Sequence, residues 1–226
     1  MPNKGNKEYG MEQIWHKNGG NMKVILASAS PRRKELLAQM GIPFSCMPSQ
    51  KEEQLTSDSP KEVVKQLSLQ KAEDILQQTE GDILVIGSDT IVACEEKILG
   101  KPKSEEEAFY MLNLLQGRTH FVYTGVAILY RKAGKVESNL LEEHTAVEMY
   151  HMTEAEIFSY IATKEPMDKA GAYAIQGRGA VYIQGIHGEY NTVVGFPIAR
   201  VYQELKKMKL MEQILVEETY DKTDCK

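Results

Sequence analysis

The sequence predicts an α/β fold in which helices flank a mixed, twisted sheet, and two patterns along the chain support this class. Apolar, strand-like runs alternate with helical segments in the first half, which is typical of strands joined by helices. Two long segments of alternating apolar and polar residues then follow one another at about 119–130 and 137–149. Such neighbours favour an antiparallel hairpin, so the sheet is expected to be mixed rather than purely parallel.

The first half is predicted to hold three strands and two helices. Each helix begins at a serine–proline pair, which suits an N-cap followed by the first helical residue. The second helix presents one apolar face, formed by Val63, Val64, Leu67, Ala72, Ile75 and Leu76. In chain order the expected elements are strand 23–28, helix 31–40, strand 44–47, a helix from residue 60, and strand 83–87.

The second half is predicted to begin with a hairpin at 91–99 and to contain three helices besides the two long strands. Ser104 with Glu107, and Thr153 with Glu156, form capping-box patterns at the start of two helices, and Pro197 begins the last. A glycine-rich stretch at 164–179 is expected to be a loop, and a short strand is expected at 180–184.

The composition is that of an ordinary globular protein. The 226 residues, 42% hydrophobic and 26% charged, suffice for one domain or two compact lobes with a proper core. The formal net charge of −5 argues against binding to nucleic-acid polymers. No apolar run reaches the roughly 18 residues that would predict a membrane span. Three widely spaced cysteines fit a reducing cytoplasm better than a disulfide framework.

The two ends of the chain differ from its middle. Residues 1–21 are polar and rich in glycine and asparagine, without the apolar core of a signal peptide, and are expected to form a flexible extension. Residues 209–226 are expected to form an acidic, mobile tail. The folded domain is therefore predicted at residues 22–208.

The turn between the first strand and the first helix has the features of an anion site. Ser30 is placed as N-cap and Pro31 as the first helical residue, with Arg32 and Arg33 directly after it. Free backbone N–H groups, the positive end of the helix dipole and two guanidinium groups would then converge on one position, which suits a phosphate chain. An ordinary capped turn with solvated arginines fits the local pattern equally well.

Three further polar clusters lie on loops or element ends, at Glu52 and Glu53, at Asp89 with Lys101, and at Gln176. Carboxylates suit a hard divalent cation such as Mg²⁺, so together with the anion turn they match metal-assisted phosphoryl chemistry. Each has a plainer interpretation, because the glutamates could be solvated, Asp89 could cap its strand and Lys101 could be an exposed turn residue.

The five histidines form no i,i+4 pair and no cluster with cysteine, so a zinc site is not expected. His120 is interpreted as a packing or hydrogen-bonding residue rather than a catalyst.

Five segments taken together resemble the Maf family of nucleoside triphosphate pyrophosphatases: SASPRRKELL (28–37), GSDTIV (87–92), GKPKSEEEA (100–108), DKAGAYAIQGRGA (168–180) and YNTVVGFPIARVY (190–202). The resemblance covers about residues 23–206. It implies a two-lobed fold of the inosine-triphosphate-pyrophosphatase type with a cleft between the lobes. It also implies hydrolysis of a nucleoside triphosphate to the monophosphate and pyrophosphate with Mg²⁺, Mn²⁺ or Co²⁺, in a cytoplasmic homodimer that acts on neither nucleic-acid polymers nor membranes.

Carried over residue by residue, the resemblance gives Asp89 the role of catalytic acid/base and metal ligand. Glu53 matches the second acidic position, although the doubled glutamates leave Glu52 as an alternative by one residue. Lys71 and Lys101 match two catalytic lysines. On this basis the hypothesis is that a metal-assisted water, oriented or deprotonated by Asp89, attacks the α-phosphorus.

The same resemblance assigns substrate binding to the anion turn and to two positions further along the chain. Ser28, Arg32 and Arg33 match the phosphate-binding turn, and Arg32, Thr90 and Gln176 match positions associated with base choice. Gln176 resembles the dTTP/UTP subgroup, whereas the 7-methyl-GTP subgroup tends to carry an acidic residue there. A side-chain amide can both donate to and accept from the O4/N3–H edge of thymine or uracil, which a carboxylate cannot.

Two other functions remain open from the sequence. One is cleavage of purine, damaged or methylated nucleotides by an enzyme of the same family. The other is a non-catalytic, nucleotide-binding regulator of cell division, although the presence of Asp89, both lysines and the arginine pair favours an enzyme.

Overall fold

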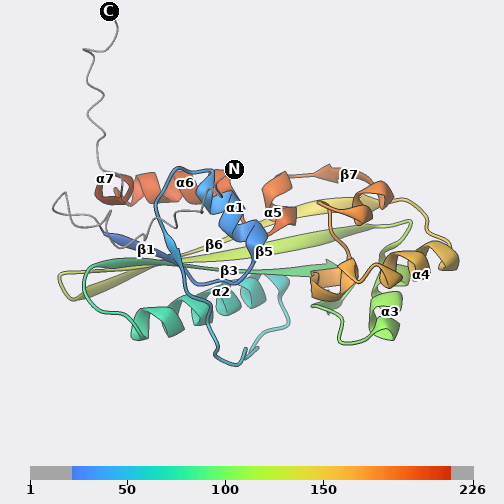
Figure 1. Ribbon diagram of the computed structural model, residues 1–226, viewed down its shortest axis with the longest axis horizontal. Helices are drawn as coiled ribbons and strands as arrows, with labels where there is room; N and C mark the ends of the chain where they lie inside the picture. The colour runs from blue at the N-terminus through green and yellow to red at the C-terminus, as the bar shows by residue number, and fades with distance from the viewer. Residues whose placement is uncertain (1–21, 215–226) are drawn as a thin grey trace, which may run out of the picture.

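The computed structural model describes residues 22–214, which form one curled, seven-stranded sheet with helices packed on both faces (Figure 1). The strand order is β2-β1-β3-β5-β6-β7, and β4 pairs with β3. The strands are β1 (Lys23–Leu26), β2 (Ser45–Cys46), β3 (Ile83–Cys94), β4 (Lys97–Leu99), β5 (Thr119–Lys132), β6 (Lys135–Met149) and β7 (Ile183–His187).

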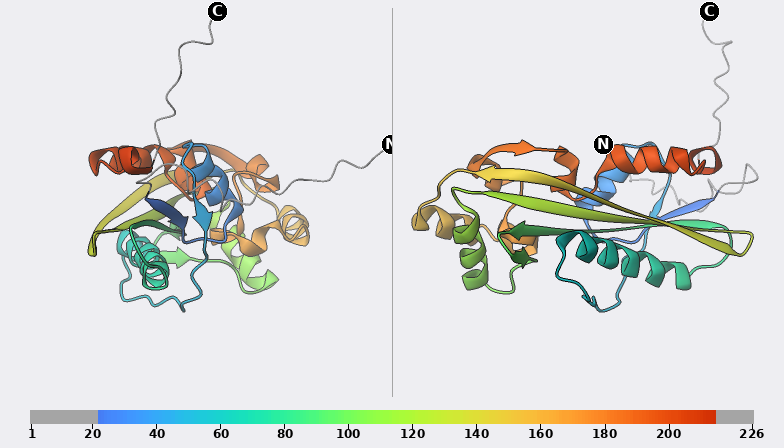
Figure 2. Two further views of the ribbon diagram at one scale, coloured as in Figure 1. Left: turned by 60° about the vertical axis from the view of Figure 1, so that its left-hand side comes forward. Right: turned by 180° about the vertical axis from the view of Figure 1, so that it is seen from behind.

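The sheet is mixed, as the sequence predicts. β1 pairs in parallel with both β2 and β3, whereas all other described pairs are antiparallel. The expected long hairpin is present, with β5 and β6 in register from Thr119 opposite Glu148 to Lys132 opposite Lys135. The views in Figure 2 show the long strands β3, β5 and β6 twisting across one another along the molecule.

Helices cover both faces of the sheet. The helices are α1 (Pro31–Ala38), α2 (Pro60–Gln77), α3 (Glu105–Leu115), α4 (Glu154–Ala162), α5 (Tyr190–Val194), α6 (Ile198–Lys207) and α7 (Met211–Ile214). In Figure 1, α2 lies below the sheet, whereas α1 and α6 lie above it. The predicted inner face of α2 is fully buried.

Two glycines allow α2 to approach the sheet closely. A Cβ atom at Gly87 of β3 would lie 2.2 Å from the Ser68 carbonyl oxygen, and one at Gly125 of β5 would lie 2.2 Å from that of Val64. Because glycine has no side chain, the backbone of α2 can pack directly on the two central strands at these positions.

The described residues form four apolar clusters. Two of them lie where α2 packs on the sheet, and the other two mark two lobes along the long strands. In the first lobe, Leu84 and Ile86 of β3 pack with α1, α6 and α7. In the second lobe, Val92 and Cys94 of the same strand pack with α3 and α4. The cleft implied by the family resemblance is therefore expected where β3 passes between these cores.

Strand β3 is longer than predicted. The sequence analysis ended this strand at Gly87 and placed Asp89 at its carboxyl end, but β3 continues to Cys94. The reason is the partner strand: residues from Ile83 to Ala93 pair without interruption with β5. Asp89 consequently lies in the middle of a central strand, not at its end.

The stretch predicted as a loop at 164–179 contains short 3₁₀ helices. These are η2 (Glu165–Asp168), η3 (Ala170–Ala172) and η4 (Arg178–Tyr182). Because η4 occupies residues 178–182, the last strand begins at Ile183 and not at 180 as predicted. Helix α5 was not predicted.

The two predicted capping boxes differ in outcome. Thr153 and Glu156 form the complete reciprocal pair at the start of α4. Ser104 caps α3, but the Glu107 carboxylate accepts from the Lys103 N–H instead of from Ser104.

The described chain extends past the predicted domain boundary at residue 208. Helix α7 begins at Met211, and Met211 and Ile214 are buried in the core of the first lobe. The tail predicted at 209–226 therefore starts with residues that belong to the packed domain. Its remaining part, 215–226, and the predicted extension at 1–21 lie outside the described residues.

Candidate active site

A gap along one edge of β3 opens the sheet at its centre. On this edge β1 pairs with β3 from Ile83 to Ile86, and β4 pairs with it from Val92 to Cys94. Within the described chain, no strand covers the edge from Gly87 to Ile91. The gap arises because β1 turns into α1 just after Ala27, whose N–H still bonds to the Ile86 carbonyl at 2.8 Å.

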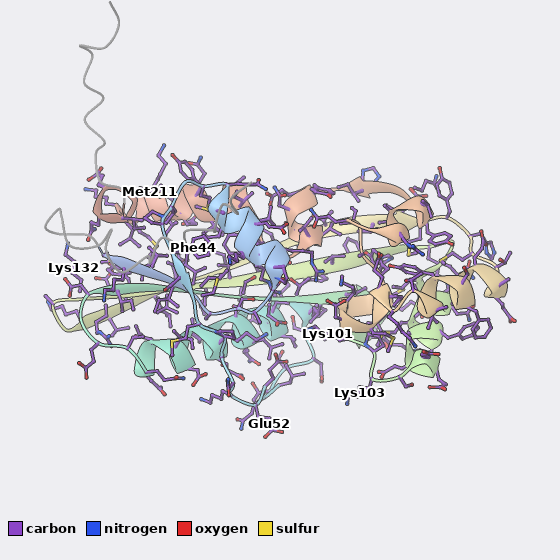
Figure 3. All side chains as sticks on the ribbon, in the orientation of Figure 1. Phe44, Glu52, Lys101, Lys103, Lys132 and Met211 are labelled. Carbon is purple, nitrogen blue, oxygen red and sulfur yellow. The ribbon has the colours of Figure 1, made fainter. Side chains whose placement is uncertain are left out.

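Three connected cavities meet at this gap and form one cleft. The first, here called the Asp89 cavity, is lined by residues of α2, β3 and the loop before α2. The Ser28 cavity lies over the β1–α1 turn, and the Gln176 cavity lies against the second lobe. Lys101 lines all three, and Figure 3 shows it where the two halves of the molecule meet.

The cleft brings together every site residue predicted from the sequence. They lie on the β1–α1 turn, α1, the loop before α2, α2, β3, the segment after β4 and the segment before η4. The residues are Ser28, Arg32, Arg33, Glu53, Lys71, Asp89, Thr90, Lys101 and Gln176.

In the Asp89 cavity two carboxylates converge on one ammonium group. The Lys71 Nζ of α2 forms ion pairs with Asp89 Oδ1 and, at 2.9 Å, with Glu53 Oε1. Asp89 is buried, with 9% of its surface exposed, so its charge is held largely away from water beside that lysine. Both glutamates are exposed, but Glu53 lines the Asp89 cavity and pairs with Lys71, whereas Glu52 is labelled at the outer side of its loop in Figure 3.

The pair Asp89 and Glu53 fits a hard divalent cation that arrives with an anionic substrate. Both carboxylates already point at a single positive charge, that of Lys71. The described residues contain no cluster of three or more histidine, cysteine or acidic side chains that could hold a metal alone. Mg²⁺ is commonly bound by one or two carboxylates, with substrate phosphates and water completing its coordination.

Arg33 connects three segments of the cleft wall. Its Nε donates to the Gly195 carbonyl at 2.9 Å, its Nη2 to Thr90 Oγ1 at 3.0 Å and its Nη1 to Ser28 Oγ at 3.4 Å. Burial lowers the pKa of the Arg33 guanidinium, and the charge of Asp89 acts in the opposite direction. Three of its five N–H groups thus bond to protein oxygens, so Arg33 holds the wall in shape.

Thr90 links this arginine to the strand behind it. Its Oγ1 lies 3.0 Å from Thr124 Oγ1 on β5, and the Thr124 hydroxyl donates to the Thr192 carbonyl at 2.7 Å. Arg32, in contrast, lines the Ser28 and Gln176 cavities, and its side chain forms no hydrogen bond to any residue within 22–214. Of the two adjacent arginines, Arg32 is therefore the one with its whole donor set available to a ligand.

The β1–α1 turn has the predicted N-cap. Ser30 Oγ accepts the Arg33 N–H at 3.5 Å, and Ser28 Oγ accepts the Ser30 N–H at 3.2 Å. Pro31 occupies the first helical turn.

Asp168 and Lys169 also line the cleft and were missed as site residues. Asp168 borders both the Ser28 and the Gln176 cavities and is ion-paired with Lys169. Burial acts to raise the pKa of Asp168, but Lys169, Arg32 and Lys101 outweigh it and lower that pKa. The signal was present, since both residues begin the segment 168–180 from which only Gln176 was nominated.

The Gln176 cavity has an apolar part beside its charged rim of Arg32, Lys101, Asp168 and Lys169. Its floor includes Val92, Val122 and Tyr173, and the exposed Gln176 side chain forms no hydrogen bond to any described residue. Behind the floor, His120 Nε2 lies 2.7 Å from the Tyr173 hydroxyl, and burial lowers the pKa of His120 to about 4. His120 is thus a buried hydrogen-bonding residue, as the sequence analysis interpreted it.

Among the described residues, no helix has both the length and the apolar character needed to cross a membrane.

Comparison with known proteins identifies the family. A family model described as Maf-like protein matches residues 23–208. A dTTP/UTP pyrophosphatase of Agathobacter rectalis is 53% identical over 198 residues, which cover 82% of this chain and 97% of the relative. Proteins of the same name from Lachnoclostridium phytofermentans and Bacillus cereus are 52% and 50% identical, covering 81% and 86% of this chain and 94% of each relative. The chain belongs to the Maf family, whose pyrophosphatase members suggest a requirement for a divalent metal.

Proposed function

We propose that this protein is a pyrophosphatase that hydrolyses dTTP and UTP to the nucleoside monophosphate and pyrophosphate. The observation that carries the proposal is the convergence, at the gap in β3, of a paired carboxylate site, a cationic turn and the cavity that holds Gln176. Relatives about half identical to this chain carry the name dTTP/UTP pyrophosphatase, which supports the substrate class.

Asp89 is the proposed catalytic base. It orients a water molecule and accepts its proton while the water oxygen attacks the α-phosphorus. The new bond joins that oxygen to the α-phosphorus, and the bond to the oxygen bridging the α- and β-phosphates breaks. Pyrophosphate leaves with the electrons of that bond, and the monophosphate remains. The ion pair with Lys71 supports this role because it holds the buried Asp89 carboxylate in position.

Cations around the cleft would stabilise the negative charge that grows on the leaving pyrophosphate. Lys71 and Lys101 line the Ser28 cavity together with Arg32, so these three positive groups surround the space over the anion turn. Ser28 and the first backbone N–H groups of α1 complete this phosphate site. Arg33 contributes mainly by holding Ser28 and Thr90 in position.

Asp89 and Glu53 are the proposed ligands of a divalent cation, Mg²⁺, Mn²⁺ or Co²⁺. Such a cation supplies electrophilic polarisation of the phosphate oxygens and a lowered pKa of bound water. On binding it would compete with the Lys71 ammonium for both carboxylates, so this lysine is expected to turn toward the substrate phosphates.

Gln176 is proposed to select the base. Its amide lines the Gln176 cavity and forms no hydrogen bond to a described residue, so it can pair with the O4/N3–H edge of thymine or uracil. Arg32 and Thr90 border the same cavity and are proposed to set the position of the nucleotide between base and phosphates.

The proposal also includes a homodimer that works in the cytoplasm. Sedimentation equilibrium of the purified chain measures the oligomeric state. A mass of one chain at micromolar concentration would contradict the homodimer.

The decisive experiment measures pyrophosphate release from dTTP, UTP, CTP, GTP and 7-methyl-GTP, with Mg²⁺, Mn²⁺ or Co²⁺ and with a chelator. Rapid, metal-dependent release from dTTP and UTP is expected. Preferential release from GTP or 7-methyl-GTP would replace the proposed substrate class with a purine one. Nucleotide binding without release from any member of the panel would indicate a non-catalytic regulator.

A further inference from the structure

The segment that carries Gln176 is fastened on both sides by one pair of side chains, Tyr160 and Glu165. Before Gln176, the Ala174 N–H donates to the Tyr160 hydroxyl at 3.1 Å. After it, the Arg178 and Gly179 N–H groups donate to the two Glu165 carboxylate oxygens at 3.0 and 3.1 Å. The Tyr160 hydroxyl itself donates to Glu165 Oε1 at 2.8 Å, so the two side chains act as one connected clamp.

The clamp is built on the end of α4 and does not depend on the rest of the cleft. Tyr160 is buried in the core of the second lobe, and Lys164 takes a left-handed conformation, φ 63°, directly before Glu165. This turn folds the chain back so that the Glu165 carboxylate lies beneath the Gln176 segment. Left-handed backbone at a lysine is sterically costly and persists where surrounding contacts hold it.

Two glycines show how closely the Gln176 segment is held. A Cβ atom at Gly177 would lie 2.5 Å from Glu165 Oε2, and one at Gly179 would lie 2.6 Å from the Tyr160 hydroxyl. The backbone on the carboxyl side of Gln176 therefore rests directly on the clamp. Only residues without a side chain allow this approach.

The direction of the pKa shifts agrees with an ionised Glu165 carboxylate that accepts hydrogen bonds on both oxygens. Burial acts to raise the pKa of Glu165, but the N–H groups of Arg178 and Gly179 and the Tyr160 hydroxyl outweigh it and lower that pKa. Burial and the hydrogen bond to Glu165 raise the pKa of Tyr160, which keeps its hydroxyl protonated as the donor. Hydrogen bonds to an ionised acceptor are about twice as strong as neutral ones.

We infer that Glu165 and Tyr160 are positioning residues for base selection, which hold the Gln176 amide at the wall of the Gln176 cavity without touching the substrate. The inference rests on the proposed function, because it needs Gln176 to contact the base. The phosphate site lies on other elements, so the clamp should affect which nucleotide is chosen and how tightly its base binds. It should leave the chemical step at Asp89 unchanged.

The test uses the full chain with Glu165→Gln and Tyr160→Phe, each of which keeps side-chain size. The amide of Glu165→Gln offers one acceptor oxygen where the carboxylate offers two, and Tyr160→Phe removes the hydroxyl alone. For each variant we expect the KM for dTTP to rise about tenfold with kcat within about twofold of wild type. The preference for dTTP over GTP should fall toward that of Gln176→Ala.

Two measurements separate positioning from general damage. Inhibition by tripolyphosphate, which has no base, should be unchanged. In the double variant Glu165→Gln/Gln176→Ala, the preference should be no lower than in Gln176→Ala alone, because both changes remove the same contact. Glu156→Gln is the matched control, since it weakens the capping box of the same helix α4 and leaves the clamp intact. Its nucleotide preference should equal that of wild type.

Failure of this inference is distinguishable from failure of the proposed function. A wild-type enzyme that releases no pyrophosphate from dTTP or UTP overturns the proposed function. An active wild type whose Glu165→Gln and Tyr160→Phe variants keep its KM and preference overturns the clamp. Wild-type preference in Gln176→Ala also overturns it, because nothing would then be positioned. An equal loss of preference in Glu156→Gln would show only a structural effect of α4 and overturn it as well.

Discussion

The two ends of the cleft differ in how they handle charge. At the first lobe, Asp89, Glu53 and Lys71 form ion pairs beside Lys101 and Arg32. The end at the second lobe is here called the neutral end, because its residues Gln176, His120 and Tyr173 are uncharged. It also holds the Asp168–Lys169 ion pair, and Arg32 and Lys101 border both ends. Arg33 and Thr90 join the two ends.

This contrast separates two tasks. Every nucleoside triphosphate carries the same phosphates, so the charged end can bind and cleave them without regard to the base. Discrimination between bases depends on hydrogen bonds to the base edge, where a mismatched donor or acceptor stays unpaired and is costly. The Gln176 amide offers such hydrogen bonds at the neutral end. Changes at the charged end should therefore lower the rate for all nucleotides alike, and changes at the neutral end should alter preference or stability.

The largest effect is expected from Asp89→Asn. An amide cannot accept the proton of the attacking water, so kcat should fall by about 10³-fold for every nucleotide tested. The unfolding midpoint should stay close to wild type, because the Lys71 ammonium keeps its contact with Glu53. Pyrophosphate release and thermal unfolding measure the two quantities.

Glu52→Gln and Glu53→Gln provide the matched pair for this experiment. Glu52 is exposed, and Glu53 contacts Lys71, so only Glu53→Gln should weaken activation by the metal. A folded Asp89→Asn enzyme with near-normal activity, or loss of metal activation in Glu52→Gln instead of Glu53→Gln, would contradict the assignment of the charged end.

The second-largest effect is a loss of stability in acid that originates from His120 at the neutral end. Burial lowers the pKa of His120 from 6.5 to about 4, so between these values the unfolded chain binds a proton that the folded protein does not. The free energy of unfolding should therefore fall as the pH drops from 6.5 to 4, by roughly 3 kcal/mol from this group. Urea unfolding at a series of pH values measures it.

His120→Gln keeps a hydrogen-bonding group beside Tyr173 but does not titrate in this range. Its unfolding free energy should depend less steeply on pH than that of wild type across the same window. Identical slopes for the two proteins would show that His120 is not the buried neutral group inferred here.

Thr90→Val tests the junction between the two ends. It removes the oxygen that accepts from Arg33 and neighbours Thr124, leaving a partly buried charged donor without that partner. The free energy of unfolding, measured by urea denaturation, should fall by about 2 kcal/mol in Thr90→Val. Thr90→Ser keeps the hydroxyl, so its free energy of unfolding should stay close to that of wild type. Equal stability of Thr90→Val and wild type would mean that the two ends are not coupled through this hydroxyl.

The smallest effect is a change of preference in Gln176→Glu. A carboxylate only accepts, which disfavours the mixed edge of thymine and suits the donor edge of guanine, so the ratio of kcat/KM for dTTP to that for GTP should fall about tenfold. Gln184→Glu, an equal charge change at an exposed position of β7, should leave the ratio unchanged. An unchanged ratio in Gln176→Glu would remove this residue from base selection.

Much of the fold followed from local patterns in the chain. The inner face of α2, the complete capping box of α4 and the hairpin of β5 and β6 each depend on residues close in sequence, and each was predicted. Errors arose where a distant partner decided the outcome. β3 continues through Asp89 because β5 pairs with it, and 3₁₀ helices occupy the stretch predicted as a loop.

The candidate site divides in the same way. Residue types and motifs predicted all the site residues that later met in the cleft. They did not decide between Glu52 and Glu53 and did not show that Arg32 and Arg33 have different roles. Asp168 and Lys169 begin the motif at 168–180, but the motif alone did not show that these two charges line the cleft together with Gln176. The clamp of Tyr160 and Glu165 has no motif at all.

The sequence by itself determined the fold class, the family and the chemical groups of the cleft, because strand and helix periodicity, caps and short motifs are properties of neighbouring residues. Only the tertiary structure decided which of those groups meet. Arg33 bonds to the carbonyl of Gly195, 162 residues away, and Lys71 reaches Asp89 from another element. Such contacts exist only once the two lobes have packed on one twisted sheet, since packing, not local propensity, brings distant segments within bonding distance.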